Sequence, residues 1–321
     1  MEKRKLGRTG LQVSELGFGC WAIGGTSYGP TNDQESLKAL SYAFDHGINF
    51  FDTADTYGHG HSEELVGETF KESSKRLQVV IASKVGWDFY HGGNKKNFDS
   101  AYIRFACGES LKRLKTDYID LYQLHNPKLE MIEEGNVFKI LAELKKEGKI
   151  RHCGVSIHLA REGAAAIQNG TSETIQAIYN IVDQRIKYEL VPLCEEHDMG
   201  LIAREPLYCG LLSGKYTAET KFSKDDHRNR WMKDKYLTDL KKIERIKTAF
   251  DCNKVSLKQA AIEFVLCEKA VSVVIPGIKT VSHVEDHLRA VNEPKLTPEE
   301  ISQIHKLYQE DELFQTGFYR N

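Results

Sequence analysis

Four residues whose side chains can hold or move protons each lie at the end of an apolar run of this chain, or in the loop just after one. They are Asp52, Tyr57, Lys84 and His125, in the segments INFFDTADTYG (48–58), QVVIASK (78–84) and YIDLYQLH (118–125). A carboxylate, a phenol, an ammonium and an imidazole are together the groups needed to place a proton on a carbonyl oxygen. The pattern therefore predicts general acid chemistry at such an oxygen.

Each of the four has an expected role in this chemistry and an ordinary structural alternative. A free tyrosine is a poor acid at neutral pH because its pKa is about 10, so we expect Lys84 to lower the pKa of Tyr57. Asp52 would hold Lys84, and His125 would donate to the carbonyl. Taken singly, the four are explained by a helix cap, a surface loop, a solvated strand end and core packing. Their shared placement, with a second carboxylate at Asp55, favours a site, and the set lacks the nucleophile and base of acyl transfer.

Eight apolar runs separated by helical patterns must position these residues. The runs are continuously apolar, as strands of a buried parallel sheet are, and they span 15–19, 48–52, 78–83, 118–124, 151–157, 174–179, 200–205 and 271–276. Helices are predicted over 32–47, 99–115 and 137–149, the last with Gly148 as its C-cap. Eight strand–helix units in this length predict an α/β fold, a (β/α)8 TIM barrel, formed by residues 1–321 as a single domain. Parallel strands would then bring the four residues to one rim.

A doubly wound sheet with a dinucleotide fingerprint is the alternative fold. Gly17, Gly19 and Ala22 match G-x-G-x-x-A, but that motif should open a helix. Here it runs into GCWAIGGTSYGP (19–30), a glycine-rich loop that ends in proline. We therefore interpret these glycines as a tight loop at a strand end. The spacing of the runs is regular except between the last two, where the polar segment 210–231 predicts a long functional loop.

Composition and charge exclude several classes of partner. The chain has 321 residues, 40% of them hydrophobic, a net charge of -2 and no concentrated basic face, so nucleic acid and anionic membranes are poor partners. The charged start of the chain has no apolar stretch behind it, which argues against a signal peptide, and no run is long enough to span a bilayer. The seven cysteines are scattered, with no C-x-x-C pair. A cytoplasmic protein with reduced thiols and no metal site is expected.

Longer stretches around the four residues resemble the aldo-keto reductase family. The matching segments are FDTADTYGHGHSEELVGE, ASK, LYQLH, GVS (154–156), QAIYNIVDQR (176–185), EPLYCGLLSGKY (205–216) and IPGIKTVSHVEDH (275–287), in family order over nearly the whole chain. The later motifs are more similar to the bacterial and potassium-channel-β-subunit-like branches than to human aldose reductase. The resemblance implies a (β/α)8 barrel that uses NAD(P)H to reduce an aldehyde or ketone to an alcohol. By its pattern, Tyr57 is the general acid, Lys84 and Asp52 tune it, and His125 orients the carbonyl.

The resemblance also implies a nicotinamide site, with departures from the family. Ser156 and Gln176 take the positions that bind the nicotinamide carboxamide. Ile157 replaces the asparagine of the family's GVSN motif, so one polar contact is lost or comes from His158. Arg204 stands where an aromatic residue often stacks on the nicotinamide. We expect Arg204 either to pair with the glutamate that follows it or to lie against the nicotinamide or an anionic substrate group.

Two later segments are expected to bind the phosphates of the cofactor. In 210–215 the resemblance implies contacts to the pyrophosphate at Leu211, Ser213 and Lys215. In 277–287 it implies a pocket for the 2′-phosphate and adenine, formed by Gly277, Lys279, Thr280, His283, Asp286 and His287. A helix N-terminus there favours an anion, so NADPH is the expected cofactor, with NADH as the alternative. A solvated turn and an exposed lysine are the ordinary explanations of the two segments.

The substrate is the least specified part of the prediction. Its expected pocket walls are Trp21, Tyr28, Trp87 and Asn126, together with Cys20, Phe89 and Trp231, although loop packing explains Trp87 and Trp231 equally well. The aromatic segment 313–321 is expected to fold over the pocket mouth. Sugars, keto-sugars, aliphatic aldehydes and quinones all fit as small-molecule substrates, and a homo-oligomer stays open. The alternative function is a cofactor-binding regulatory or redox-sensing subunit with slow turnover.

Overall fold

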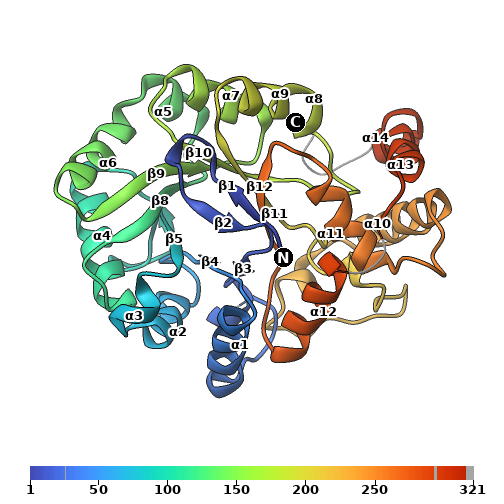
Figure 1. Cartoon of the computed structure of the whole chain (residues 1–321), viewed down its shortest axis with the longest axis horizontal. Coiled ribbons are helices and arrows are strands. Elements are labelled where there is room, and N and C mark those ends of the chain that lie inside the picture. The colour runs from blue at the N-terminus through green and yellow to red at the C-terminus, as the bar shows by residue number, and fades with distance from the viewer. Residues whose placement is uncertain (26, 293–294, 316–321) are drawn as a thin grey trace.

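The computed structural model describes residues 1–25, 27–292 and 295–315 and has eight parallel strands at its centre (Figure 1). These strands are β3 (Phe18–Gly19), β4 (Phe50–Asp52), β5 (Val80–Val85), β8 (Ile119–His125), β9 (Ile150–Ser156), β10 (Thr174–Ile178), β11 (Gly200–Arg204) and β12 (Val271–Ile275). Along the chain, each of these eight strands pairs with the next of the eight. The parallel bridges Leu16↔Val274 and Gly19↔Gly277 join the segment of β3 to that of β12. The strands therefore close into a barrel, which confirms the predicted (β/α)8 fold.

Every predicted apolar run overlaps one of the barrel strands, and the differences lie at the ends of the runs. The run 48–52, for example, begins two residues before β4. Ile48 is buried without belonging to the strand, and Asn49 is committed elsewhere, because its side chain accepts from Ser14 N at 2.6 Å and donates to Gln12 O at 2.9 Å. An apolar or buried residue at the end of such a run thus does not always belong to a paired strand.

Helices form the outer ring around the barrel (Figure 1). Those that follow the strands in turn are α1 (Asp33–Asp45), α2 (His61–Phe70), α4 (Ser100–Leu114), α6 (Asn136–Lys146), α7 (Ala160–Gln168), α9 (Val191–Glu196), α11 (Leu257–Leu266) and α12 (Val281–Asn292). Further helices are α3 (Ser73–Arg76), α5 (Leu129–Glu134), α8 (Ile186–Glu189), α10 (Lys233–Ile246), α13 (Pro298–Glu310) and α14 (Glu312–Gln315). The three helices predicted from periodicity correspond to α1, α4 and α6, and Gly148, with φ 73°, follows α6 in the left-handed conformation expected after a helix end.

A short antiparallel hairpin, β1 (Lys3–Lys5) and β2 (Gln12–Ser14), covers the amino-terminal end of the barrel (Figure 1). Leu6 and Val13 of this hairpin pack with Phe50, Leu121 and other inward-facing strand residues in one buried cluster. A second, larger apolar cluster lies between the sheet and the helices. Because the hairpin closes the amino-terminal end, a site within the barrel has to open at the carboxyl ends of the strands.

The glycines of the apparent dinucleotide fingerprint serve barrel closure. A Cβ on Gly19 would lie 2.7 Å from Pro276 O, and a Cβ on Gly17 would lie 2.9 Å from a methyl carbon of Ile275. Gly17 N donates to Val274 O at 2.8 Å. These positions therefore need glycine because the first and last strand segments approach closely there. A short 3-10 turn, Ala22–Gly24, follows them, so the fingerprint interpretation is excluded by its context.

Three further segments matter for the site. A second hairpin, β6 (Trp87–Asp88) and β7 (Lys95–Lys96), follows β5. The predicted long loop 210–231 lies between β11 and α10 and contains the 3-10 turns Leu211–Ser213 and His227–Arg230. Of the segment expected over the pocket mouth, residues 316–321 lie outside the described residues, and Phe314 packs on Tyr308 of α13, with ring centroids 6.1 Å apart.

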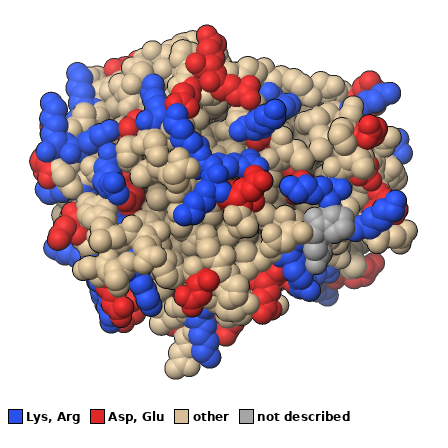
Figure 2. Space-filling view, viewed as in Figure 1, with Lys and Arg blue, Asp and Glu red and all other residues tan. Residues whose placement is uncertain are grey.

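Charges of both signs are interspersed on the face of the molecule that carries the β1–β2 hairpin (Figure 2). Lys and Arg side chains lie beside Asp and Glu side chains there. Lys5 of β1, for example, pairs with Asp198 at 2.6 Å. Within residues 1–25, 27–292 and 295–315, no helix is long and apolar enough to cross a membrane.

Candidate active site

The four residues singled out in the sequence meet at the carboxyl ends of β4, β5 and β8. Lys84 is fully buried, and its Nζ donates to Asp52 Oδ1 at 2.5 Å, to Thr53 O at 2.8 Å and to Tyr57 OH at 3.2 Å. The ring of His125 lies edge-on to that of Tyr57, with centroids 6.0 Å apart. Parallel pairing produces this meeting, because Asp52 is in register with Ala82 on β5 and Lys84 with Gln123 on β8.

Lys84 stays charged in spite of its burial. Loss of solvent by itself lowers the pKa of an amine, but the neighbouring Asp52 and Tyr57 outweigh that effect and raise the pKa of Lys84 above its ordinary value. A buried ammonium with three hydrogen-bond acceptors is fully satisfied, since it has three donors. The ammonium is therefore a permanent positive charge beside the Tyr57 hydroxyl.

The expectation that Lys84 would bring the pKa of Tyr57 below its usual value is not met as a net effect. Burial raises the pKa of Tyr57, and the opposing influence of Lys84 is smaller than that of burial. Asp52 also raises it, because a carboxylate disfavours a nearby phenolate. The sequence did not reveal how far the surrounding protein removes solvent from the Tyr57 hydroxyl. As a consequence, Tyr57 is a protonated phenol at neutral pH.

His125 is held in its neutral form. Burial lowers the pKa of His125 well below its ordinary value, and the positive charges of Lys84, Lys96 and Arg204 lower it further. Its Nδ1 is buried without a hydrogen-bond partner among the described residues. A neutral imidazole has one N–H donor, so this ring can donate a hydrogen bond to an oxygen in front of Tyr57.

The Asp52 carboxylate is oriented by two buried amides as well as by Lys84. Gln176 Nε2 donates to Asp52 Oδ2 at 2.7 Å, and Gln123 Nε2 donates to the same oxygen at 3.3 Å. Gln123 was missed by sequence reasoning, although its position between apolar neighbours in YIDLYQLH was a signal of a buried polar group facing the barrel interior. Gln176 was predicted to bind a carboxamide and is here also tied to Asp52.

A cavity of about 780 Å³ lies in front of these residues at the carboxyl ends of the strands. Among its lining residues are the predicted Trp21, Tyr28, Trp87, Asn126, Ser156, Gln176, Arg204, Ser213, Lys215, Gly277, Lys279, His283 and His287, together with Asp52, Tyr57 and His125. Cys20 lines it as well. The structure thus brings most of the predicted site into one pocket, with Lys84 directly behind its wall.

Besides Lys84, five predicted residues are not among those that line the cavity. One of them, Asp286, forms ion pairs with Lys258 and Arg289. Leu211 is buried in the core between sheet and helices, and the Oγ1 of Thr280 accepts from His283 N at 3.3 Å at the start of α12. Phe89 stacks on His59 with ring centroids 5.1 Å apart, and Trp231 packs edge-on to His227 at 5.8 Å. Loop packing, the alternative given for Trp231, describes its contacts.

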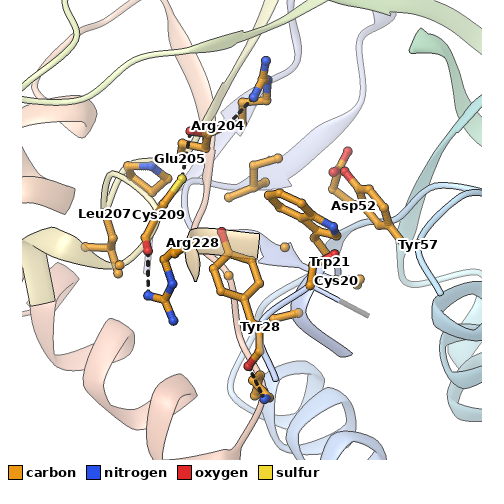
Figure 3. Close-up of a pocket in the computed structure, with 18 of the residues that line it drawn as sticks. Cys20, Trp21, Tyr28, Asp52, Tyr57, Arg204, Glu205, Leu207, Cys209 and Arg228 are labelled. Carbon is orange, nitrogen blue, oxygen red and sulfur yellow. Dashed lines mark hydrogen bonds and ion pairs between the residues drawn. The ribbon is translucent and has the colours of Figure 1, made fainter. Parts of the chain in front are cut away.

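Two loops meet across the pocket (Figure 3). Tyr28 forms an antiparallel bridge with Asp226, and its ring lies between Arg228, at 5.1 Å from the ring centroid, and the indole of Trp21, at 5.1 Å between centroids. Arg228 Nη1 donates to Cys209 O at 3.0 Å. The loop after β3 and the loop after β11 are therefore joined by a cation–aromatic stack.

Lys279, the expected 2′-phosphate ligand, is part of the same junction. Its Nζ donates to Tyr28 O at 3.1 Å and to Pro30 O at 2.8 Å. Burial lowers the pKa of Lys279, and Asp226 opposes that change. The lysine lines the pocket while holding the loop after β3.

Arg204 forms the expected pair with Glu205 and also lines the pocket. Its Nη2 donates to Ile157 O at 3.1 Å and contacts His158 Nδ1 at 3.2 Å. Its side chain lines the pocket (Figure 3). The contact to the Ile157 carbonyl brings the guanidinium to the position where the expected asparagine is missing. Glu205 itself has φ 58°, an uncommon backbone conformation for a residue other than glycine.

The far end of the pocket carries two histidines of α12. His287 is 3% exposed, and both of its ring nitrogens lack a hydrogen-bond partner among the described residues. Burial lowers the pKa of His287 to about 3 and also lowers that of His283. A buried, neutral imidazole that lines a cavity with both nitrogens free of protein partners is suited to a polar ligand group.

The model of the aldo/keto reductase family matches residues 15–309. The chain belongs to this family. Membership identifies it as an oxidoreductase, and confirms the resemblance that was seen in the motifs.

Curated relatives cover nearly the whole chain. The uncharacterized oxidoreductase YqkF of Bacillus subtilis is 33% identical over 97% of this chain and 98% of its own length. A probable voltage-gated potassium channel subunit beta of Arabidopsis thaliana is 30% identical over 96% of this chain and 97% of its own length.

Solved structures with the same fold include aldo-keto reductase AKR11C1 from Bacillus halodurans in its holo form, with a TM-score of 0.79 and 32% identity over 96% of both chains. An aldo/keto reductase from Klebsiella pneumoniae in complex with NADP and acetate has a TM-score of 0.71 and 27% identity, again over 96% of both chains.

Proposed function

We propose that this protein reduces an aldehyde or ketone to an alcohol with NAD(P)H, with Tyr57 as the general acid. The observation that carries the proposal is the contact of Lys84 Nζ with Tyr57 OH at 3.2 Å, while the same ammonium is held by Asp52 at 2.5 Å. The hydroxyl of Tyr57 faces a large cavity, so a substrate oxygen has access to it. Family membership supports the reaction type.

Four residues of the chain have different proposed roles in the reduction of the carbonyl group. Tyr57 donates its proton to that oxygen, and the positive charge of Lys84 stabilises the phenolate that remains. The neutral imidazole of His125 donates a hydrogen bond that orients the carbonyl, since its low pKa leaves it uncharged. Asp52 keeps Lys84 charged and in place. When bound, a nicotinamide cofactor supplies the hydride.

The pocket fits a nicotinamide cofactor. Gln176, which donates to Asp52, and Ser156, in register with Gln176 on the next strand, are the proposed contacts of the carboxamide. Arg204 is the proposed neighbour of the nicotinamide ring. Proposed contacts of the phosphates and adenine are Ser213, Lys215, Gly277, Lys279, His283 and His287. The unpartnered nitrogens of His287 support a polar ligand at that end. The NADP found in the Klebsiella structure supports NADPH as the cofactor of this chain, and NADH is the alternative.

The proposed substrate is a small carbonyl compound, with sugars and keto-sugars among the candidates. Trp21, Trp87 and Asn126 line the pocket; the two tryptophans offer aromatic faces, and Asn126, which follows His125, offers an amide. Trp21 is stacked against Tyr57 with ring centroids 6.1 Å apart. Apolar walls with a few polar groups are typical of pockets for small ligands.

A regulatory or redox-sensing subunit with slow turnover is the second candidate function. The observation that favours this candidate is the similarity to the Arabidopsis thaliana relative, which is named as a probable potassium channel subunit. The completely assembled set of Asp52, Tyr57, Lys84 and His125 favours the enzyme.

Initial rates of NADPH oxidation with a panel of aldehydes, ketones and sugars test the proposal. Tyr57→Phe is the matched control, because it keeps the ring and removes only the transferable proton. We expect turnover in the wild type and its loss in the variant, with the Kd for NADPH nearly unchanged. Near-wild-type turnover of Tyr57→Phe would contradict the role of Tyr57, and very slow wild-type turnover with tight NADPH binding would favour the regulatory subunit.

A further inference from the structure

Lys96 lies at the end of the β6–β7 hairpin and contacts the strand end that carries His125. Its Nζ donates to His125 O at 2.5 Å and to Asn126 O at 2.8 Å. His125 is the last residue of β8, and Asn126 has φ 54°, which is an uncommon backbone conformation for a residue other than glycine. A single ammonium therefore binds two successive carbonyl oxygens at a turn that needs support.

The same ammonium connects this turn to an aromatic wall of the pocket. It lies 4.3 Å from the ring centroid of Trp87 and 5.6 Å from that of Phe98. Trp87 is also the backbone partner of Lys96 in the hairpin. Because Trp87 and Asn126 both line the cavity, Lys96 fixes two of its walls relative to each other.

Lys96 also acts on His125 through its charge. It is among the cations that keep the pKa of His125 low, and it lowers the pKa of His158 in the same way. Lys96 as a whole residue is exposed, but the partial loss of solvent around its ammonium lowers the pKa of Lys96 to about 8, and Glu162 of α7 opposes this shift. The ionisable groups around Lys96 are thus Glu162 on α7, His125 on β8 and His158 after β9, and of these Glu162 favours the charged form of Lys96.

We propose that Lys96 is a positioning residue for carbonyl reduction: its ammonium caps the end of β8 and fixes the turn that presents His125 and Asn126. The inference rests on the proposed function for its effect on catalysis, whereas the contact itself does not. Because a neutral amine binds carbonyl oxygens more weakly than an ammonium does, the cap weakens as the pH rises through about 8. Reduction should decline over the same range.

Two substitutions at this position separate charge from packing. Lys96→Met removes the charge and keeps much of the aliphatic chain, and Lys96→Arg keeps a positive charge at every accessible pH. We expect Lys96→Met to lower kcat by about ten- to a hundredfold, because small misplacements of catalytic groups cost that much, with the Kd for NADPH unchanged. Lys96→Arg should recover kcat and should not lose activity above pH 8 as the wild type does. Lys95→Met, an exposed neighbour in the same hairpin, is the matched control.

The fluorescence of Trp87 tests the contact without any substrate. Titration of the ammonium 4.3 Å from its ring should change tryptophan emission near pH 8 in the wild type and in Lys95→Met, but not in Lys96→Met or Lys96→Arg. Trp87→Phe, which should also lack the transition, assigns the signal among the three tryptophans. If the tryptophan emission changes near pH 8 but the protein reduces no carbonyl compound, the contact of Lys96 with the end of β8 is upheld and the proposed function is overturned. Absence of the transition, unchanged kcat in Lys96→Met, or equal losses in Lys96→Met and Lys96→Arg would each overturn the role of Lys96.

Discussion

The ammonium of Lys279 donates a hydrogen bond to the carbonyl oxygen of Tyr28 at 3.1 Å, across a sequence separation of 251 residues. Lys279 follows β12 and Tyr28 follows β3, the last and the first strands of the barrel. These two strands are neighbours only because the barrel closes. The pocket wall that Tyr28 forms is thus held by the lysine proposed to bind the 2′-phosphate of the cofactor. Phosphate binding by Lys279 would have to compete with this contact.

Lys279→Met should weaken NADPH binding more than NADH binding. A charge-assisted contact contributes about 1.5–3 kcal/mol, or roughly ten- to a hundredfold in Kd, and we expect the lower end because Lys279 first gives up two carbonyl oxygens. Titration of both cofactors by fluorescence quenching measures the difference. Equal losses for NADPH and NADH would mean that Lys279 acts only on the loop.

Lys84→Met should slow reduction and move the alkaline limb of alcohol oxidation to higher pH. Burial already raises the pKa of Tyr57, and Lys84 opposes that rise, so loss of the ammonium leaves the phenol still harder to ionise. The pH profile of kcat for oxidation is the measurement. An unmoved limb with preserved activity would show that Lys84 does not act on Tyr57.

Arg204→Leu should weaken cofactor binding and also lower the Tm, because it leaves Glu205 without its charged partner. The double variant Arg204→Leu/Glu205→Gln separates these effects by removing the unpaired carboxylate. We expect the double variant to recover stability but not affinity for NADPH, measured by thermal unfolding and cofactor titration. Recovery of both would identify Arg204 as a structural residue only.

Asp55→Asn should become more stable relative to the wild type as the pH rises. Asp55 is fully buried, neither of its carboxylate oxygens has a partner among the described residues, and burial together with Glu63 raises its pKa well above the ordinary value. A group whose pKa is raised by folding stabilises the fold below its unfolded pKa of about 4 and loses that contribution as the pH rises toward the folded pKa.

The free energies of unfolding of the two proteins should therefore diverge by about 1.4 kcal/mol for each pH unit in that range, in favour of Asp55→Asn. Denaturant titrations between pH 4.5 and pH 8 measure the divergence. Glu63→Gln is the matched control, since it breaks the pair with Arg113 at 2.8 Å and should lose stability at neutral pH. A constant difference between Asp55→Asn and wild type would show that Asp55 is ionised in the folded protein.

The strands and the placement of the four tetrad residues were predictable from sequence, for a local reason. Buried parallel strands are apolar along their whole length, so the runs around Asp52, Lys84 and His125 stood out from the polar loops. Residues at the carboxyl ends of such strands must share one rim. The contact of Lys84 with Asp52 and Tyr57 was expected on the condition that the strands pair in parallel, and the structure shows it.

The contacts that tune the site were decided by tertiary structure. Lys279 meets Tyr28, and Lys96 meets the carbonyl of His125, only because loops from different strands converge on one rim. Sequence spacing does not encode such contacts, since each depends on the path of two loops. The raised pKa of Tyr57 likewise depends on how much protein surrounds its hydroxyl, a quantity that exists only once the barrel has closed.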